Sequence, residues 1–338
     1  MREINVLHMG GYSSTNIGNA FYDLGIRHVL LSLNKKINLF TTSDLQEYAW
    51  SRYNSKRSRS FDPCEHFSGM DYIIWSGPMF TAMDMGERKN ILHKAKETGT
   101  KIICLSAGGS RYTQEEVEQV REVLQKFDLY ALFSRDSETY ENYKDLFKYS
   151  YKGICCAFYI PEYFKSWKLD VRPYVVFNFE QYREPFFVKA EEGFEFAGNV
   201  WGRAKHLASI NKKHLMHNVG PERAFDILDI VRTKNTCFEP RQKKYYGKNI
   251  YLSDVPEDYL NIYANAEAVF SDRVHTCVGA LSQGIPTMFM GNTPRANLFK
   301  RVIGEKYDEI YQKPTYVAVS DLDKERERLR IKLGEVLI

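Results

Sequence analysis

Short apolar runs alternate with longer amphipathic stretches through the first half of the chain. The apolar runs predict six strands, at residues 4–8, 37–41, 72–75, 101–106, 130–134 and, more weakly, 153–157. Apolar residues at helical spacing predict helices at 17–33, 87–97, 114–126 and 137–147. Strands that alternate with helices in this way are typical of a parallel α/β sheet.

A second alternation follows a linker at 161–173. Its predicted strands cover 173–180, 248–254, 268–272 and 287–291, with helices at 256–266 and 275–283. The pattern favours no element between 181 and 246. We therefore expect an α/β protein with two Rossmann-like domains that face each other across a cleft: residues 1–165, residues 172–320, and a terminal helix at 321–338.

Composition limits the class of protein. The chain has 338 residues, of which 43% are hydrophobic and 27% charged, as in soluble globular proteins. Its formal charge of +4 suits a small anionic substrate or an anionic membrane surface and does not require nucleic acid as a partner. The basic segment 51–60 is expected to be a solvated surface loop.

No apolar run approaches the roughly 18 residues that span a bilayer, and the N-terminus leads directly into a strand. The six cysteines show no metal-ligand spacing, and the adjacent Cys155 and Cys156 are poorly placed for a disulfide. Cys104, inside an apolar run, is expected to be a buried thiol. We expect a cytoplasmic protein without a metal or cofactor, and association with the inner face of the membrane stays open.

Polar loops follow several predicted strands at the ends where parallel sheets bind ligands. The first loop is rich in small and polar residues and leads into a helix, which suits an anion or, equally, a tight turn that caps the helix. Gly77, Gly108 and Gly109 follow two other strands and should expose backbone at the same edge. The candidate acceptor or anion loop residues are Ser14, Asn16, Gly18, Asn19, Gly77, Gly108 and Gly109.

Arg135 follows another strand directly. Asp136 is placed to cap the next helix, which would aim Arg135 over the strand edge toward the cleft. The alternative is a surface ion pair with Asp136 or Glu138.

Arg273 and His275 stand at the end of the strand at 268–272. Residues i and i+2 of an extended segment point to the same side, so the two side chains can converge on one ligand. A helix of small residues follows, with Gly284 as its left-handed cap. A guanidinium, an imidazole and a helix N-terminus together favour a doubly anionic ligand, although a structural Arg/His pair would have the same sequence.

Three segments resemble one family. SDRVHTCVGALSQGIPTMFMGNTPR resembles the R-x-H…A-x-x-x-G-x-P…P-K/R signature of the polysaccharide pyruvyl transferases. SRDSETYE is similar to the family's R-D-x-x-S/T segment, and NIGNAFYDLGI to its N-x-G-D opening, with Asn19 at the position of the Asp. The resemblance implies a glycosyltransferase-B-like (GT-B-like) fold. It also implies a phosphoenolpyruvate-dependent transferase that builds a pyruvyl ketal on a sugar of a cell-surface polysaccharide precursor, such as an exopolysaccharide of the cell envelope.

The resemblance also implies roles for individual residues. Arg135, Arg273 and His275 would hold phosphoenolpyruvate, the co-substrate, and carry the catalysis, with Arg295 also contacting it. His275 is the candidate proton donor, because a phosphate beside it would favour imidazolium. Neither the resemblance nor the sequence identifies the general base, and Asp23, Glu87 and Asp254 are no more than guesses for it.

The saccharide acceptor, free or lipid-linked, would belong to the N-terminal domain, and the oligomeric state is open. Three alternatives stay open: a GT-B glycosyltransferase with a nucleotide-sugar donor, an inactive glycan-binding relative, and a cytoplasmic interaction domain.

Overall fold

The computed structural model describes residues 2–10, 16–43, 63–87, 89–182, 184, 186–189, 194–198, 229–236 and 249–338. Ser14 and the expected loop at 51–60 lie outside these residues. The chain forms two compact units. The first comprises Met1–Phe164, Thr293–Gly304 and Ala318–Ile338, and the second comprises Lys165–Asn292 and Glu305–Val317.

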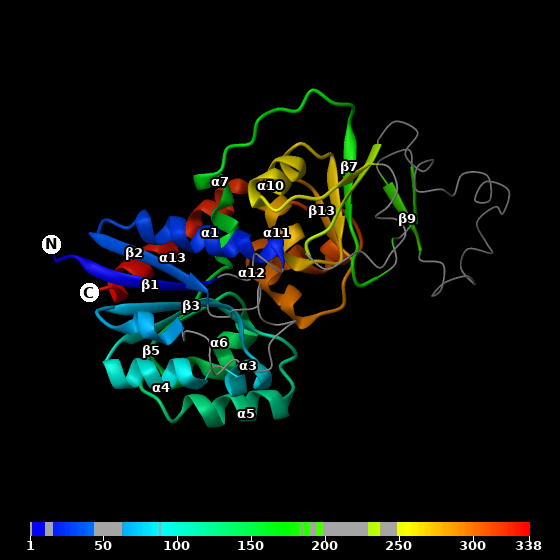
Figure 1. The fold of residues 1–338 in the computed structure, drawn as a ribbon. Coiled ribbons are helices and arrows are strands. Elements are labelled where there is room, and N and C mark those ends of the chain that lie inside the picture. The colour runs from blue at the N-terminus through cyan, green and yellow to red at the C-terminus, as the bar shows by residue number, and fades with distance from the viewer. Residues whose placement is uncertain are drawn as a thin grey trace, which may run out of the picture. The chain divides into compact units, whose positions relative to one another are not determined.

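The first unit contains a six-stranded parallel sheet in the order β2-β1-β3-β4-β5-β6 (Figure 1). The strands are β1 (Ile4–Gly10), β2 (Ile37–Ser43), β3 (Tyr72–Phe80), β4 (Lys101–Gly109), β5 (Leu129–Ser134) and β6 (Phe147–Lys152). The first five lie where the apolar runs predict them, although β3 and β4 continue further than expected.

The predicted strand at 153–157 is wrong. The sixth strand is β6, and Cys156–Tyr159 forms a short 3-10 helix. β6 is an edge strand with only Phe147 buried, so it has no continuous apolar run. The apolar residues that follow are buried for another reason: a Cβ on Gly25 of α1 would lie 1.9 Å from the Cys156 carbonyl oxygen, so helix and segment are in close contact.

Helices cover both faces of this sheet. Figure 1 shows α4 and α5 on one face and α1 and α13 on the other. The helices of the unit are α1 (Ile17–Leu31), α3 (Ala82–Glu87), α4 (Lys89–Thr98), α5 (Gln114–Leu124), α6 (Ser137–Tyr143), α7 (Ile160–Tyr163), α12 (Lys300–Ile303) and α13 (Val319–Val336), with 3-10 helices at Pro63–Phe67, Lys144–Leu146, Cys156–Tyr159 and Pro294–Phe299.

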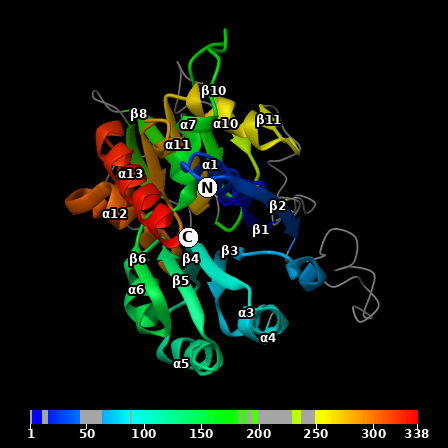
Figure 2. The ribbon, with the colours of Figure 1, turned by 90° about the vertical axis from the view of Figure 1, so that its left-hand side faces the viewer.

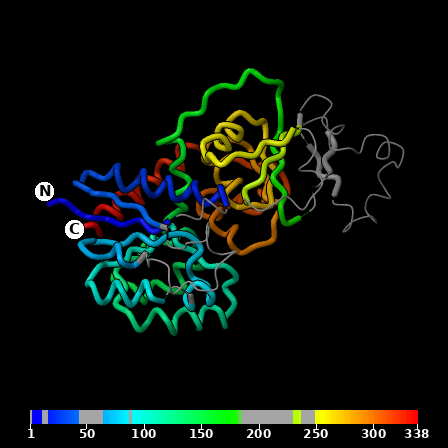
Figure 3. The backbone as a smooth tube through the Cα atoms, in the orientation of Figure 1, coloured from blue at the N-terminus to red at the C-terminus, as the bar shows by residue number. Residues whose placement is uncertain are grey.

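The C-terminal helix predicted at 321–338 is present as α13 and packs in the first unit. The Tyr72 and Tyr130 hydroxyls each donate a 2.8 Å hydrogen bond to the main-chain oxygens of Ile338 and Val336. The end of α13 therefore lies beside the starts of β3 and β5, and both chain termini lie on the same side of the unit (Figures 2 and 3). The hydrophobic pattern of residues 172–320 does not predict that residues 293–304 also belong to the first unit.

The second unit contains a five-stranded parallel sheet in the order β11-β10-β7-β12-β13. Its elements are β7 (Tyr174–Asn178), β10 (Asp229–Thr233), β11 (Ile250–Tyr251), α10 (Pro256–Ala264), β12 (Ala268–Ser271), α11 (Val274–Leu281), β13 (Thr287–Phe289) and a 3-10 helix at Gly304–Tyr311; β8 (Phe186–Lys189) and β9 (Phe194–Gly198) form a separate antiparallel pair. β10 falls in the region for which the pattern favours no element.

Within the described residues, no helix is both long enough and apolar enough to cross a bilayer. Their five cysteines are buried, as predicted for Cys104, and burial raises the pKa of that thiol.

Candidate functional site

The strand order of each sheet reverses at one place. In the first unit the chain moves outward from β1 to β2 and then returns past β1 to β3; in the second it moves from β7 to β10 and β11 and then returns past β7 to β12. Open parallel sheets bind ligands beyond the carboxyl ends of the strands at such a reversal. In the second unit, Glu180 follows β7 there, and Asp272 and Arg273 follow β12.

Arg273 is the N-cap residue of α11, with extended backbone angles (φ −108°, ψ 119°). Its N–H donates to the Ser271 hydroxyl at 2.8 Å. Because α11 begins at Val274, His275 is already the second helical residue, and the expectation of an extended segment from Arg273 to His275 is wrong. Their convergence on one ligand stays a prediction. Gly284 adopts φ 77°, as predicted for a left-handed cap.

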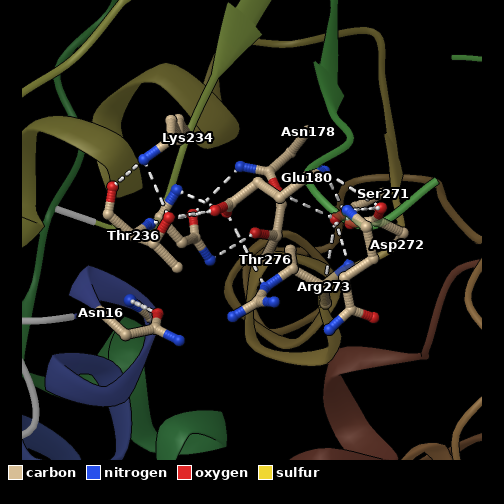
Figure 4. Close-up of polar contacts among 12 residues, drawn as sticks. Asn16, Asn178, Glu180, Lys234, Thr236, Ser271, Asp272, Arg273 and Thr276 are labelled. Carbon is tan, nitrogen blue, oxygen red and sulfur yellow. Dashed lines mark hydrogen bonds and ion pairs between the residues drawn. The ribbon is translucent and has the colours of Figure 1, made fainter. Parts of the chain in front are cut away.

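Glu180 forms an ion pair with Arg273. Its Oε1 lies 3.8 Å from Arg273 Nε and accepts the Asn235 N–H at 2.7 Å, while Oε2 accepts the Thr236 N–H at 3.2 Å. Figure 4 shows Glu180 between Arg273 and the segment at 234–236. The carboxylate therefore links the arginine to the backbone that follows β10.

Asp272 fixes the turn that carries Glu180. Its carboxylate accepts the N–H groups of Glu180 at 3.0 Å, Gln181 at 2.7 Å and Tyr182 at 2.8 Å. Burial raises the pKa of Asp272, although these N–H groups and the charge of Arg273 act in the opposite direction. Sequence reasoning missed Asp272 and Glu180; the available signal was their position directly after two buried strands.

A polar network connects the strand ends to α11. Asn178 Nδ2 donates to Asn235 Oδ1 at 3.0 Å, and Asn235 Nδ2 donates to Thr276 Oγ1 at 2.9 Å. The buried Lys234 donates to the main-chain oxygen and the hydroxyl of Thr236. Lys234, which sequence reasoning also missed, adds a second cation to this edge (Figure 4).

In the first unit, Arg135 is 2% exposed. Asp136 caps α6 as predicted and accepts the Thr139 N–H at 2.7 Å, but a surface ion pair for Arg135 is wrong because both groups are buried, with Arg135 Nε 4.0 Å from Asp136 Oδ2. Arg135 Nε and Nη1 have no hydrogen-bond partner among the described residues. The guanidinium packs on Gly108, where an added Cβ would lie 2.4 Å from Nε.

Arg295 also contacts the segment at 108–110, because its Nη2 donates a hydrogen bond to the Ser110 hydroxyl at 3.3 Å. Beside it, the Gly109 N–H donates to the Tyr112 hydroxyl at 2.8 Å, and this hydroxyl donates to Asp136 at 2.9 Å. Burial raises the pKa of Asp136 despite the charge of Arg135 and the hydrogen bonds of Thr139 and Tyr112. The structure therefore brings two of the predicted arginines, Arg135 and Arg295, to one segment.

The predicted glycines do not lie in loops. Gly77, Gly108 and Gly109 belong to the ends of β3 and β4, where the strand register shifts and Gly77 adopts φ 88°. The apolar runs end before these glycines, so the strands were predicted too short. Asn16 caps α1 through its side-chain oxygen, which accepts the Gly18 N–H at 3.0 Å.

The three candidate bases differ in position. Asp23 lies beside His8 and Ser76 at the strand reversal of the first unit. Glu87 is the last residue of α3, and Asp254 is exposed in the loop between β11 and α10. Within the described ranges, no group of three or more His, Cys, Asp or Glu side chains is arranged to hold a metal ion.

The chain is similar in fold to UDP-sugar enzymes. The S. aureus MnaA–UDP co-structure aligns with a TM-score of 0.51 and 12% identity, over 100% of this chain and 98% of that one. UDP-GlcNAc 2-epimerase from Neisseria meningitidis, bound to UDP-GlcNAc, aligns with a TM-score of 0.54 and 11% identity, over 99% and 100%. No curated protein sequence matches significantly. These likenesses define an α/β protein of the GT-B-like class.

The family follows from the sequence itself. The family described as "Polysaccharide pyruvyl transferase" matches this chain over residues 16–294, a range that includes Arg135, Arg273 and His275. The chain belongs to the polysaccharide pyruvyl transferase family.

Proposed function

We propose that this protein transfers the enolpyruvyl group of phosphoenolpyruvate to a sugar, forms a cyclic pyruvyl ketal and releases phosphate. The observation that carries the proposal is the position of Arg273 and His275 at the start of α11, beside the strand reversal, in a chain that belongs to this family.

Phosphoenolpyruvate carries a carboxylate and a phosphate, and the second unit offers complementary groups. Arg273 supplies a planar fork that matches either anion, with Glu180 on its Nε side to set its orientation. The N-terminus of α11 adds positive potential, and Lys234 adds a buried cation nearby. The family resemblance also implies a role for Arg135 and Arg295 in binding phosphoenolpyruvate.

The chemistry requires a proton donor and a proton acceptor. A sugar hydroxyl adds to C2 of phosphoenolpyruvate while C3 takes a proton, so the double bond becomes a methyl group on a tetrahedral carbon. The C2–O bond to phosphate then breaks, and a neighbouring hydroxyl closes the ketal and gives up its proton. His275 is the proposed donor to C3, and the arginines stabilise the departing phosphate.

The acceptor is a saccharide of a cell-envelope polysaccharide precursor, free or lipid-linked, and the reaction takes place in the cytoplasm. Saccharide-type substrates agree with the family and with the N. meningitidis neighbour, which is bound to UDP-GlcNAc.

Calorimetric titration of phosphoenolpyruvate, without added metal, tests the proposed donor. We expect binding to wild type and, for Arg273→Lys, affinity at least about tenfold weaker, because a point charge replaces the bidentate fork. Absence of binding at millimolar phosphoenolpyruvate, or Arg273-dependent binding of UDP-GlcNAc instead, would contradict the donor assignment.

A further inference from the structure

Polar side chains from three elements meet at the strand reversal of the first unit. His8 Nε2 on β1 lies 3.4 Å from Asp23 Oδ1 on α1 and 3.4 Å from Ser76 Oγ on β3. The Ser76 hydroxyl donates to the same Asp23 oxygen at 3.4 Å. This cluster, hereafter the His8–Asp23–Ser76 cluster, lies toward the carboxyl ends of the two strands whose order reverses, where such sheets bind ligands.

Strand alternation explains why these side chains meet. Leu7 and Met9 belong to the apolar core that includes residues of α4 and α5, so His8 between them points to the opposite face, toward α1. Trp75 belongs to the same core, and Ser76 after it points toward α1 as well. The cluster is thus a fixed consequence of the pairing between β1 and β3.

Two glycines make room for the helix at this edge. A Cβ on Gly10, at the end of β1, would lie 2.7 Å from Asp23 Oδ1. A Cβ on Gly77 would lie 2.8 Å from the Tyr22 hydroxyl, and Gly77 adopts φ 88°, a conformation that other residues rarely take. The backbone of both strand ends therefore lies directly against adjacent residues of α1.

The members of the cluster differ in the solvent exposure of their side chains. The His8 side chain is 2% exposed, whereas the Asp23 side chain is 16% exposed, so Asp23 is the more accessible of the two. Asn19, one turn earlier on α1, carries an amide, which cannot take up a proton at ordinary pH. Asp23 offers both a hydrogen-bond acceptor and a proton acceptor at this edge.

We propose that Asp23 binds a hydroxyl of the acceptor saccharide and takes its proton, with His8 as the positioning residue behind it. The inference rests on the proposed function and names the general base of that reaction. As the sugar oxygen forms its bond to C2, its O–H bond breaks and the proton passes to the Asp23 carboxylate, while C3 takes a proton from the acid. His8 holds Oδ1, which leaves the carboxylate in one orientation.

The same helix offers a matched structural pair. His28 Nε2 lies 2.9 Å from Glu162 Oε2, a shorter contact than that between His8 and Asp23, and Arg330 contacts the same carboxylate. If the His8–Asp23 pair served only to hold α1, Glu162→Gln and Asp23→Asn would have the same kind of effect: lower stability with unchanged turnover.

Two variants of the full chain separate binding from proton transfer. The probes are methyl glycosides of D-glucose, D-mannose and D-galactose, observed by saturation-transfer NMR without phosphoenolpyruvate. Asp23→Ala removes the hydrogen-bond acceptor and should weaken glycoside binding by about tenfold or more. Asp23→Asn keeps the shape and should bind within about threefold of wild type, but turnover should fall by about 10²–10⁴-fold. Glu162→Gln should change neither quantity.

Three results would overturn the proposal. They are absence of glycoside binding to wild type, wild-type binding by Asp23→Ala, and wild-type turnover by Asp23→Asn. Circular dichroism of each variant confirms that it is folded. Asp23-dependent glycoside binding without phosphate release from phosphoenolpyruvate would support the saccharide site and count against the proposed pyruvyl transfer.

Discussion

Glu180 Oε1 lies 3.8 Å from Arg273 Nε, and the same carboxylate is held by the N–H groups of Asn235 and Thr236. Arg273, which is proposed to bind phosphoenolpyruvate, is therefore positioned by the Glu180 carboxylate, and this carboxylate is itself hydrogen-bonded to the backbone after β10. The three segments after β7, β10 and β12 act together at the edge of the second sheet.

Replacing Glu180 by Gln should lower kcat by about tenfold, equivalent to about 1.4 kcal/mol, because Arg273 loses the charge that orients it. Affinity for phosphoenolpyruvate should change by less than about threefold, since the loss of a neighbouring negative charge offsets the poorer orientation. Initial rates and calorimetry measure the two quantities.

Glu184→Gln is the matched control, because Glu184 Oε1 lies 3.0 Å from Arg232 Nε in the same unit. It removes a comparable Arg–Glu pair and should leave kcat within about twofold of wild type. An equal loss of kcat in both variants would show that Glu180 has no specific effect on Arg273.

Gly108→Ala should displace the guanidinium of Arg135. The added Cβ would lie 2.4 Å from Nε and 2.9 Å from Cζ of a side chain that is almost fully buried. Overpacking of this kind costs about 1–3 kcal/mol of unfolding free energy, which urea denaturation measures.

Gly86→Ala provides the comparison, since Gly86 lies in α3 with nothing within 4 Å of its added Cβ. Alanine is the better helix former, so this variant should gain up to about 1 kcal/mol. A Gly108→Ala protein as stable as wild type would show that Arg135 can move without cost.

Glu162 should make stability depend on pH. Burial opposes its ionisation, but the hydrogen bond from His28 and the charge of Arg330 outweigh burial and lower the pKa of Glu162 below its usual 4.5. A lowered native pKa contributes stability above pH 4.5, and this contribution is lost as the pH falls through the native pKa. Wild type should therefore exceed Glu162→Gln in unfolding free energy by about 1 kcal/mol at pH 7.

Urea titrations of both proteins between pH 3 and pH 8 (about five pH units) measure this difference. It should shrink as the pH falls below 4.5. A difference that stays constant or grows toward acid pH would contradict the charge interaction.

Local patterns predicted most of the fold because buried parallel strands have continuous apolar runs, as in β4 and β5. They failed where buried apolar residues do not form a strand and where a strand is exposed to solvent. Cys155 and Cys156 are apolar and buried but not in a strand, whereas Tyr149 in β6 is exposed on an edge strand. Residues 229–233 form β10 within the region 181–246, for which the pattern favours no element.

The candidate site was predicted in part. Arg135, Arg273 and His275 stood out because charged residues directly after strands are visible in the sequence. Glu180 and Asp272 also stand at strand ends, but the hydrogen bond between them joins positions 92 apart, so the sequence does not show that they belong to one site. The burial of Arg135 against Gly108 is likewise a tertiary contact that its polar sequence context does not reveal.

His275→Gln separates proton donation from ligand binding. If His275 protonates C3, the single-turnover rate at saturating phosphoenolpyruvate should fall by about 10²–10⁴-fold, with a smaller change in affinity. The helix dipole of α11 disfavours imidazolium, so the bound phosphate has to outweigh it. His93→Gln, on the exposed face of α4, should leave the rate unchanged. A His275→Gln rate close to wild type would make His275 a binding residue only.

Carbon-13 NMR of the protein with phosphoenolpyruvate labelled at C2 and a panel of saccharide acceptors tests the proposed pyruvyl transfer most directly. We expect the C2 signal to move from the vinyl region to that of a ketal carbon, with one inorganic phosphate released for each ketal formed. An unchanged phosphoenolpyruvate signal with every acceptor, while a nucleotide sugar is consumed instead, would contradict it.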